Sequence, residues 1–396
     1  MFSATPAASA PDRDFSSPLF RSFFLGGFEC STHRRHDGRR LDLVESTGHD
    51  RWYREDYRRL RALGIAACRE GLRWHRVERR PGRYDWSQVV PMVRAAADEG
   101  IQVVWDILHF GWPDGLDIFR PEFVIRLREF AAAFADLLRE EGGDEPPTIA
   151  PVNEPSFLSW GGGDTAYINP FARDRGKELK VQLVRAALDV MEVMRLSDPR
   201  TRFAHVDPMV HIAADPTYPQ DAAPCHAYTL ARYQAWDMIE GREWPQLGGC
   251  REYLDIIGLS FYPKNQWVHR PFRRLHPGDT QYRPFHMLLA DVWERYQRPI
   301  FVAETGTEGA ARVSWLRYVC DEVAIARARG VDVQGICLYP IINHKGWDDD
   351  RYCPNGLWDC GDERRPDAAF AREIARQVDR FAAEGIASDV SIPSAR

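Results

Sequence analysis

The chain has 396 residues, of which 44% are hydrophobic and 28% are charged, with a formal net charge of −6. A chain of this length can bury a large core, as one large α/β barrel or as two to three smaller domains. The mixed charge gives no basic field for nucleic acid, and no apolar run reaches the roughly 18 residues that a membrane helix needs. We therefore expect a soluble protein that binds neither nucleic acid nor membranes.

The N-terminal stretch from Met1 to Pro18 is rich in Ala, Ser and Pro, and it lacks a basic start followed by an apolar segment. This composition predicts a disordered leader over residues 1–20, not a signal peptide, and hence a cytoplasmic enzyme. We also expect a short C-terminal tail over residues 386–396.

The eight cysteines form no C-x-x-C pair, so they indicate neither a disulfide framework nor a zinc site. The nearest candidates for a bridge or a metal are Cys353 with Cys360 and His33 with His36, and both are weak signals. We expect most of the cysteines to be small buried apolar residues, and we expect no metal and no cofactor.

Eight near-continuous apolar runs follow one another along the chain. They begin near Phe23, Ile65, Gln102, Thr148, Arg202, Leu254, Pro299 and Val333. Runs of this kind, in place of strict alternation, are typical of strands in a parallel sheet that is covered on both faces. Their starts recur roughly every 35 to 55 residues, as expected for a βα unit repeated around a closed barrel.

Stretches with helical periodicity separate these runs. In the first, Arg51–Leu63, the side chains of Tyr53, Tyr57 and Leu60 share one face, and Gly64 supplies a left-handed stop. Further helices are predicted over Ser87–Glu99, Pro121–Glu141, Gly176–Leu196, Pro284–Gln297, Ala311–Arg329 and Pro366–Gly385.

The connection Asp215–Arg251 is the least regular, with several prolines and a weak helix over Tyr228–Ile239, and we expect extra loop there. No linker poor in apolar residues divides the chain. The pattern predicts an α/β fold, a single (β/α)8 TIM barrel over residues 21–385.

The residues that close the runs are the candidates for an active site, because barrel enzymes carry their sites at the carboxyl ends of the strands. Glu154 closes the fourth run and Glu304 closes the seventh, and Glu29 follows the first. A buried carboxylate without a partner is costly, and a purely structural strand would carry another Val or Ile there. Since strands four and seven lie on roughly opposite sides of the ring, we predict that Glu154 and Glu304 face each other.

Two facing carboxylates about 5 to 5.5 Å apart are what a retaining glycosidase needs. Arg69 on strand two would keep Glu304 ionised as the nucleophile. Glu154 faces that negative charge, which raises its pKa, so it would stay protonated and act as general acid and then as general base.

Several motifs resemble those of glycoside hydrolase family 1, in the large clan of retaining (β/α)8 enzymes, in the same order along the chain. Asn153-Glu154-Pro155 matches the acid/base motif N-E-P, and Glu304-Thr305-Gly306 is similar to the nucleophile motif E-N-G. The family patterns of strands two, three and six resemble Arg69–Arg76, His109–Pro113 and Asp255–Tyr262.

This resemblance covers nearly the whole chain, from Phe23 to about Phe381, and implies a β-glucosidase-like or β-galactosidase-like enzyme. It implies that Arg69 is the partner of the nucleophile, and that Tyr262 donates a hydrogen bond to it. It also implies that His109 and Asn153 bind the sugar. The substrate would be a small-molecule or oligosaccharide glycoside.

The chain also departs from the family pattern. The asparagine of E-N-G is Thr305, and that of strand six is Ser260. In the strand-eight motif only the last tryptophan survives, as Trp347. The glutamate that binds the outer sugar hydroxyls in the family falls at Gly346, and the strand-one glutamine falls near Arg34. The resemblance thus implies intact chemistry at the anomeric carbon and a rebuilt pocket for the rest of the sugar.

Sugar rings present apolar C–H faces, so their sites contain aromatic side chains. The aromatic residues that follow the motif ends, and that we select as candidate platforms, are Phe110, Trp112, Trp160 and Trp347.

Other functions stay open. A transglycosidase would use the same covalent intermediate, and a catalytically weak barrel would only bind a glycan. A metal-dependent isomerase or aldolase is disfavoured, because it requires metal ligands at several strand ends. The sugar, any phosphate on it and the oligomeric state are not set by the sequence.

Overall fold

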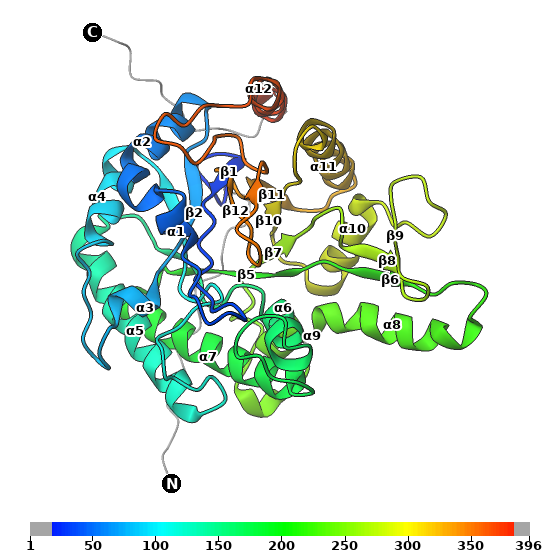
Figure 1. The fold of residues 1–396 in the computed structure, drawn as a ribbon, viewed down its shortest axis with the longest axis horizontal. Coiled ribbons are helices and arrows are strands. Elements are labelled where there is room, and N and C mark those ends of the chain that lie inside the picture. Colours follow the sequence, from blue (N-terminus) through cyan, green and yellow to red (C-terminus); the bar gives the residue numbers. More distant parts are fainter. Residues whose placement is uncertain (1–17, 384–396) are drawn as a thin grey trace.

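The computed structural model describes residues 18–383 of the chain (Figure 1). Most of the predicted leader, the predicted stop at Gly385 and the predicted tail over 386–396 lie outside the described residues. Within the range assigned to the leader, Phe20 is described and buried, and its ring centroid lies 5.1 Å from that of Phe301. Packing against the barrel therefore begins by Phe20.

Eight parallel strands close into one barrel, in the order β1-β11-β10-β7-β5-β4-β3-β2. The strands are β1 (Phe24–Gly27), β2 (Ala67–Gly71), β3 (Gln102–Asp106), β4 (Thr148–Ala150), β5 (Arg202–Pro208), β7 (Ile256–Ser260), β10 (Ile300–Thr305) and β11 (Val333–Leu338). Each of the eight predicted runs contains one of them. The predicted (β/α)8 TIM barrel is confirmed.

Alternate residues of each strand face the barrel interior and the surrounding helices, which explains why the runs are apolar throughout. On β3, Val104 belongs to the interior cluster, which it shares with Leu25, Ala204 and Phe301. Its neighbours Val103 and Trp105 belong to the outer cluster between strands and helices. The barrel is a packed core, so a site has to form at an end of it.

Helices surround the barrel (Figure 1). The long ones are α2 (His49–Ala62), α4 (Val90–Asp98), α5 (Pro121–Glu141), α7 (Gly176–Ser197), α10 (Phe285–Tyr296), α11 (Ala311–Ala328) and α12 (Ala368–Ala383). All seven were predicted, with bounds that differ by at most three residues at the described ends. No helix in the described part of the chain is long and apolar enough to cross a membrane.

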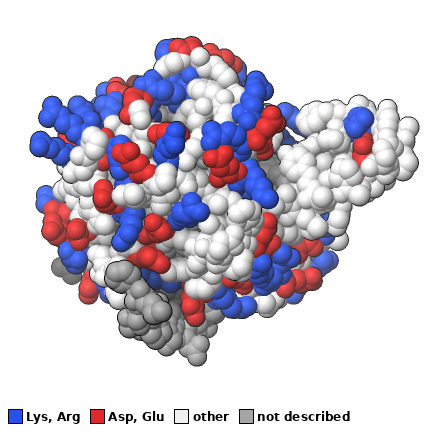
Figure 2. All heavy atoms as spheres, turned by 90° about the horizontal axis from the view of Figure 1, so that it is seen from below, with Lys and Arg blue, Asp and Glu red and all other residues white. Residues whose placement is uncertain are grey.

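The irregular fifth connection contains more structure than predicted. The weak helix over Tyr228–Ile239 is two helices, α8 (Ala222–Leu230) and α9 (Gln234–Glu240), separated by a 3-10 turn. A small sheet of β6 (His211–Ala213), β8 (Gln266–Val268) and β9 (Arg273–Arg274) lies beside α8 and projects from the barrel (Figure 1). Figure 2 shows this projection as a largely uncharged lobe.

Shorter elements complete the barrel ends. They are α1 (Leu43–Ser46), α3 (Trp74–Val77), α6 (Pro155–Leu158) and the hairpin of β12 (His344–Lys345) and β13 (Tyr352–Cys353). Helix α6 begins directly after Glu154, and the hairpin follows β11. Both therefore lie at the end of the barrel where the parallel strands finish.

Candidate active site

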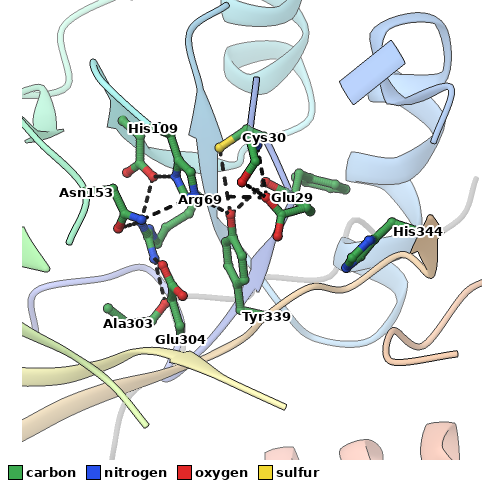
Figure 3. A network of polar contacts seen from close by, with 12 residues as sticks. Glu29, Cys30, Arg69, His109, Asn153, Ala303, Glu304, Tyr339 and His344 are labelled. Carbon is green, nitrogen blue, oxygen red and sulfur yellow. Dashed lines mark hydrogen bonds and ion pairs between the residues drawn. The ribbon is translucent and has the colours of Figure 1, made fainter. Parts of the chain in front are cut away.

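Polar side chains from the ends of five barrel strands meet at the carboxyl end of the barrel, and Figure 3 shows three of them, Arg69, Asn153 and Glu304. Arg69 lies on β2, Asp106 ends β3, and Glu304 lies near the end of β10. Asn153 and Glu154 follow β4, and Tyr262 follows β7. The structure thus brings together six residues, of which sequence reasoning singled out all but Asp106.

Glu304 is buried and receives a hydrogen bond on each carboxylate oxygen. The Nη1 atom of Arg69 donates to Oε1 at 3.0 Å, and the hydroxyl of Tyr262 donates to Oε2 at 2.9 Å. Two donors, one of them a cation, stabilise the ionised form of a carboxylate and fix its orientation.

Arg69 is the centre of this network. Besides Glu304 it donates to Asp106 Oδ2 at 2.6 Å, to Asn153 Oδ1 at 3.0 Å and to the carbonyl of Ala303 at 2.9 Å. Burial acts to lower the pKa of the guanidinium, but the charges of Asp106 and Glu304 outweigh it and raise that pKa well above its usual value. Arg69 is therefore a permanent buried cation between two carboxylates.

Glu154 lies in a different environment. Its backbone is left-handed, with φ 44° and ψ 60°, directly before α6, and its amide donates to the carbonyl of Val206 at 3.0 Å. Burial and then the negative charge of Glu304 raise the pKa of the Glu154 carboxyl well above its usual value. The two carboxyls thus differ in their surroundings: Glu304 accepts hydrogen bonds from two donors, one of them a cation, while burial and the charge of Glu304 raise the pKa of Glu154.

Asp106 was not singled out from the sequence, although it closes its strand as Glu154 and Glu304 close theirs. Burial acts to raise its pKa, but Arg69 and His109 lower it overall. His109 Nδ1 lies 2.7 Å from Asp106 Oδ2, and its Nε2 lies 3.2 Å from Asn153 Nδ2 and 3.4 Å from the Tyr339 hydroxyl. His109 is thereby fixed in the same network.

Asp207, near the end of β5, is a second carboxyl that sequence reasoning missed. It accepts hydrogen bonds from the amide of Ser156 at 2.9 Å and from its hydroxyl at 2.5 Å, and so anchors the first turn of α6. Burial raises the pKa of Asp207 to about 7. The sequence feature that could have identified Asp207 is again a carboxylate at the end of an apolar run.

The aromatic candidates divide into two groups. Trp347 packs against Phe110, Phe157 and His33, with ring centroids 5.6, 6.0 and 4.9 Å away. Trp160 is 43% exposed and touches the same cluster through Phe157.

The fourth aromatic candidate is placed differently. Trp112 is buried, its Nε1 donates to the carbonyl of Leu116, and its ring packs on Phe123 of α5. Trp112 therefore supports the loop after β3 from the helix side.

Three further positions noted in the sequence lie near the site. Arg34, which corresponds to the strand-one glutamine, points to the rim and pairs with Asp114 at 2.6 Å. Glu29 is buried, and its Oε1 accepts hydrogen bonds from the amide and the hydroxyl of Ser31. Gly346 lies in the turn of the β12–β13 hairpin.

The described residues offer little for a metal. Cys353 and Cys360 are free thiols, and the rings of His33 and His36 pack on different aromatic residues, Trp347 and Phe171. Cys30, Asp106 and His109 approach one another closely enough to share an ion. Asp106 is already bonded to the Arg69 cation and to His109, so this group is better explained as part of the polar network.

Comparison with known proteins identifies the class of fold. No protein-family model and no curated protein sequence matches the chain. Solved structures do match, and by its architecture the chain has the fold of the family 1 TIM-barrel glycosidases.

Two of these structures show how close the likeness is. A β-glucosidase from Thermotoga maritima in complex with glucoimidazole superposes with a TM-score of 0.72 at 15% identity, over 91% of this chain and 99% of that one. The AHE enzyme from Alicyclobacillus herbarius gives a TM-score of 0.76 at 17% identity, over 93% and 100%. At identities this low, the superposition establishes a shared fold.

Proposed function

We propose that the protein is a retaining β-glycosidase that hydrolyses a β-linked glycoside by double displacement. Glu304 is the nucleophile and Glu154 is the general acid/base. Arg69 and Tyr262 hold the nucleophile, and Asn153, His109 and Trp347 bind the sugar. The assignment rests on one contrast, between a carboxylate with two hydrogen-bond donors at Glu304 and a carboxyl at Glu154 whose pKa is raised well above its usual value by burial and by Glu304.

In the first step Glu304 attacks the anomeric carbon while the glycosidic bond breaks. The Glu154 proton passes to the departing oxygen, so the leaving group departs as a neutral alcohol. A covalent glycosyl–enzyme ester forms on Glu304, and Glu154 becomes ionised. Arg69 and Tyr262 stabilise the carboxylate before attack and again when the ester breaks.

In the second step the ionised Glu154 takes a proton from water, and the oxygen of that water attacks the anomeric carbon. The ester bond to Glu304 breaks, and the sugar leaves with its β configuration retained. Hydrolysis also restores the proton on Glu154. An alcohol in place of water would give transglycosylation by the same step.

The similar structures from Thermotoga maritima are β-glucosidases, and one of them is in complex with deoxynojirimycin. On this basis we propose a β-glucoside, or a close stereoisomer of it, as substrate. Neutral glycones are favoured over anionic ones because the centre already contains carboxyl groups at Glu29, Asp106 and Glu304.

The test is to measure release of nitrophenol from α and β aryl glycosides, plain and phosphorylated, and to read the first sugar anomer by NMR. The Glu304→Gly variant should lose activity by several orders of magnitude and regain it with azide, giving an α-glycosyl azide. The matched Glu154→Ala variant should give the β azide, because its nucleophile is intact.

Other outcomes would contradict the proposal. An inverted first product, or a β azide from Glu304→Gly together with an α azide from Glu154→Ala, would refute the assigned roles. A folded protein that binds sugars but cleaves none of these substrates would be the glycan-binding barrel.

A further inference from the structure

The loop after β1 carries another acidic side chain, Glu29, into the candidate site. Its Oε1 accepts hydrogen bonds from the Ser31 amide at 2.9 Å and from the Ser31 hydroxyl at 2.6 Å. Oε2 accepts no hydrogen bond from the described residues, and it is not among their solvent-inaccessible unpaired atoms. One oxygen of this carboxylate therefore remains available to a bound molecule.

Glu29 lies next to the catalytic network. Its Oε1 is 4.0 Å from His109 Nε2, and its charge contributes to raising the pKa values of Tyr262 and Tyr339. In Figure 3 Glu29 lies on the opposite side of Tyr339 from Glu304. Glu29 and the proposed nucleophile therefore lie on different sides of Tyr339, so a sugar held at Glu304 by its anomeric carbon could meet Glu29 only through its remote hydroxyls.

His33 is a second polar side chain near Glu29. Its side chain is buried, its Nδ1 is inaccessible to solvent and has no hydrogen-bond partner among the described residues, and its ring lies against Trp347. Burial lowers the pKa of His33 to about 4, although the charge of Glu29 acts in the opposite direction. His33 is therefore neutral near pH 7, with one donor and one acceptor nitrogen.

The other polar side chains around Glu29 are already engaged. His344 Nδ1 lies 2.5 Å from the carbonyl of Lys345, and its Nε2 lies 2.9 Å from Asn355 Nδ2. His109 is bonded through both nitrogens, and Arg34 is paired at the rim. Glu29 Oε2 and His33 Nδ1 are the atoms of this group that no described residue pairs, so they can add to the sugar contacts that His109 and Asn153 would make by exchanging their present partners.

We propose that Glu29 and His33 form the glycone-recognition pair of the protein, selecting a neutral sugar through its hydroxyl groups. Glu29 Oε2 accepts hydrogen bonds from hydroxyls remote from the anomeric carbon, and His33 exchanges a further hydrogen bond with them. An ionised carboxylate only accepts hydrogen bonds, so it favours hydroxyls and repels a glycone that carries carboxylate, sulfate or phosphate. The inference rests on the proposed glycosidase function.

The experiment compares wild type, Glu29→Ala and Glu29→Gln on an aryl β-glucoside, on its 3-, 4- and 6-deoxy analogues and on the aryl β-glucuronide. In wild type, loss of a hydroxyl that meets Glu29 should lower kcat/KM by about 10- to 150-fold, as for a hydrogen bond to a charged group. In both variants that penalty should shrink to a few-fold. The variants should also hydrolyse the glucuronide better relative to the glucoside.

Further variants separate recognition from folding. His33→Ala should reduce the penalty for one hydroxyl, and His33→Gln should restore part of it, because Gln also donates and accepts. Glu141, a partly exposed residue at the end of α5, pairs with Arg94, and Glu141→Gln should leave every ratio unchanged. Glu29→Gln keeps the shape of the side chain. If Glu29→Ala does not fold, the deoxy penalties measured for Glu29→Gln test the inference.

Deoxy penalties that are equal in wild type and in both folded Glu29 variants would overturn the inference, while hydrolysis itself would stand. If no aryl glycoside is cleaved, the proposed function fails separately. In that case the inference is tested by binding. The dissociation constant of the aryl β-glucoside is measured for the single variant Glu304→Gln and for the double variant Glu304→Gln/Glu29→Ala. A weakening of about 10-fold or more supports the pair, and equal constants refute it.

Discussion

Arg69 is bonded to two buried carboxylates at once, so its removal would affect both folding and chemistry. In Arg69→Met, Asp106 and Glu304 lose their cation in a buried site, which costs about 3–5 kcal/mol of unfolding free energy. We expect kcat to fall by about 1,000-fold or more, because the nucleophile also loses a positioning donor. Denaturant unfolding and aryl glycoside hydrolysis measure the two effects.

The control is Arg94→Met on α4. Arg94 forms an ion pair with Glu141 and is 61% exposed. An exposed pair of this kind contributes at most about 1 kcal/mol. Stability and kcat should therefore both stay close to the wild-type values, and an equal loss in the two variants would contradict the central role of Arg69.

Glu154 supplies a prediction about pH. Because its protonated form is the acid, activity should be lost as the pH rises through its raised pKa. The charge of Glu304 is one cause of that raised pKa, so Glu304→Gln should lower the pKa of Glu154. NMR titration of carbon-13-labelled glutamate in both proteins measures the change.

The Glu308→Gln variant is the control for this titration. Glu308 is paired with Arg351 at the rim, and it is not among the groups that raise the pKa of Glu154. It should leave that pKa in place. A Glu154 pKa that does not move in Glu304→Gln would show that the two carboxyls are not electrostatically coupled.

At the scale of elements, β2 and α2 are joined by a buried polar network behind the site. His49 lies 2.9 Å from both Asp56 and Glu70, and the Tyr57 hydroxyl donates to Glu70 at 2.8 Å. Arg364, from the loop before α12, pairs with Asp56 at 3.0 Å. Glu70 therefore joins its strand to α2, as Arg69, one residue earlier, joins it to the site.

This network predicts how stability varies with pH. Burial acts to lower the pKa of His49, but Glu70 and Asp56 raise it to about 9. A raised folded-state pKa stabilises the fold fully below about pH 6.5, and that contribution is lost as the pH rises through about 9. The loss should be roughly 3 kcal/mol. Denaturant unfolding from pH 6 to pH 10 should show it in wild type and not in His49→Gln.

Two results would decide this prediction. The difference in unfolding free energy between wild type and His49→Gln should shrink as the pH rises. A difference that stays constant across this range would mean that His49 is neutral in the folded protein.

The same elements show what a sequence pattern can predict. The eight barrel strands were predictable because a strand that is buried on both faces must be apolar along its length. Strands β6, β8, β9, β12 and β13 have two or three residues each and leave no periodic signal. The helix over Tyr228–Ile239 was wrong as a single element, because the chain turns at Ala231–Tyr233.

For the whole molecule, the position of the candidate site followed from topology. Glu154 and Glu304 were found because a carboxylate at the end of an apolar run is anomalous, and closure of the barrel brings such ends together. In the barrel, β5 and β7 lie between β4 and β10. Because neighbouring strands pair in parallel, the carboxyl ends of β4 and β10 lie at the same end of the barrel. Side-chain directions in the loops were less predictable, since Trp112 packs on α5 and Arg34 pairs at the rim.

Glu154 shows that the molecule does not minimise its free energy everywhere. A left-handed backbone disfavours any residue other than glycine, asparagine or aspartate, and burial next to Glu304 disfavours the charged form. A glycine at this position would relieve both costs and remove the proton donor. Glu154 is therefore kept at a cost in stability, which is expected if it supplies the proton of the proposed mechanism.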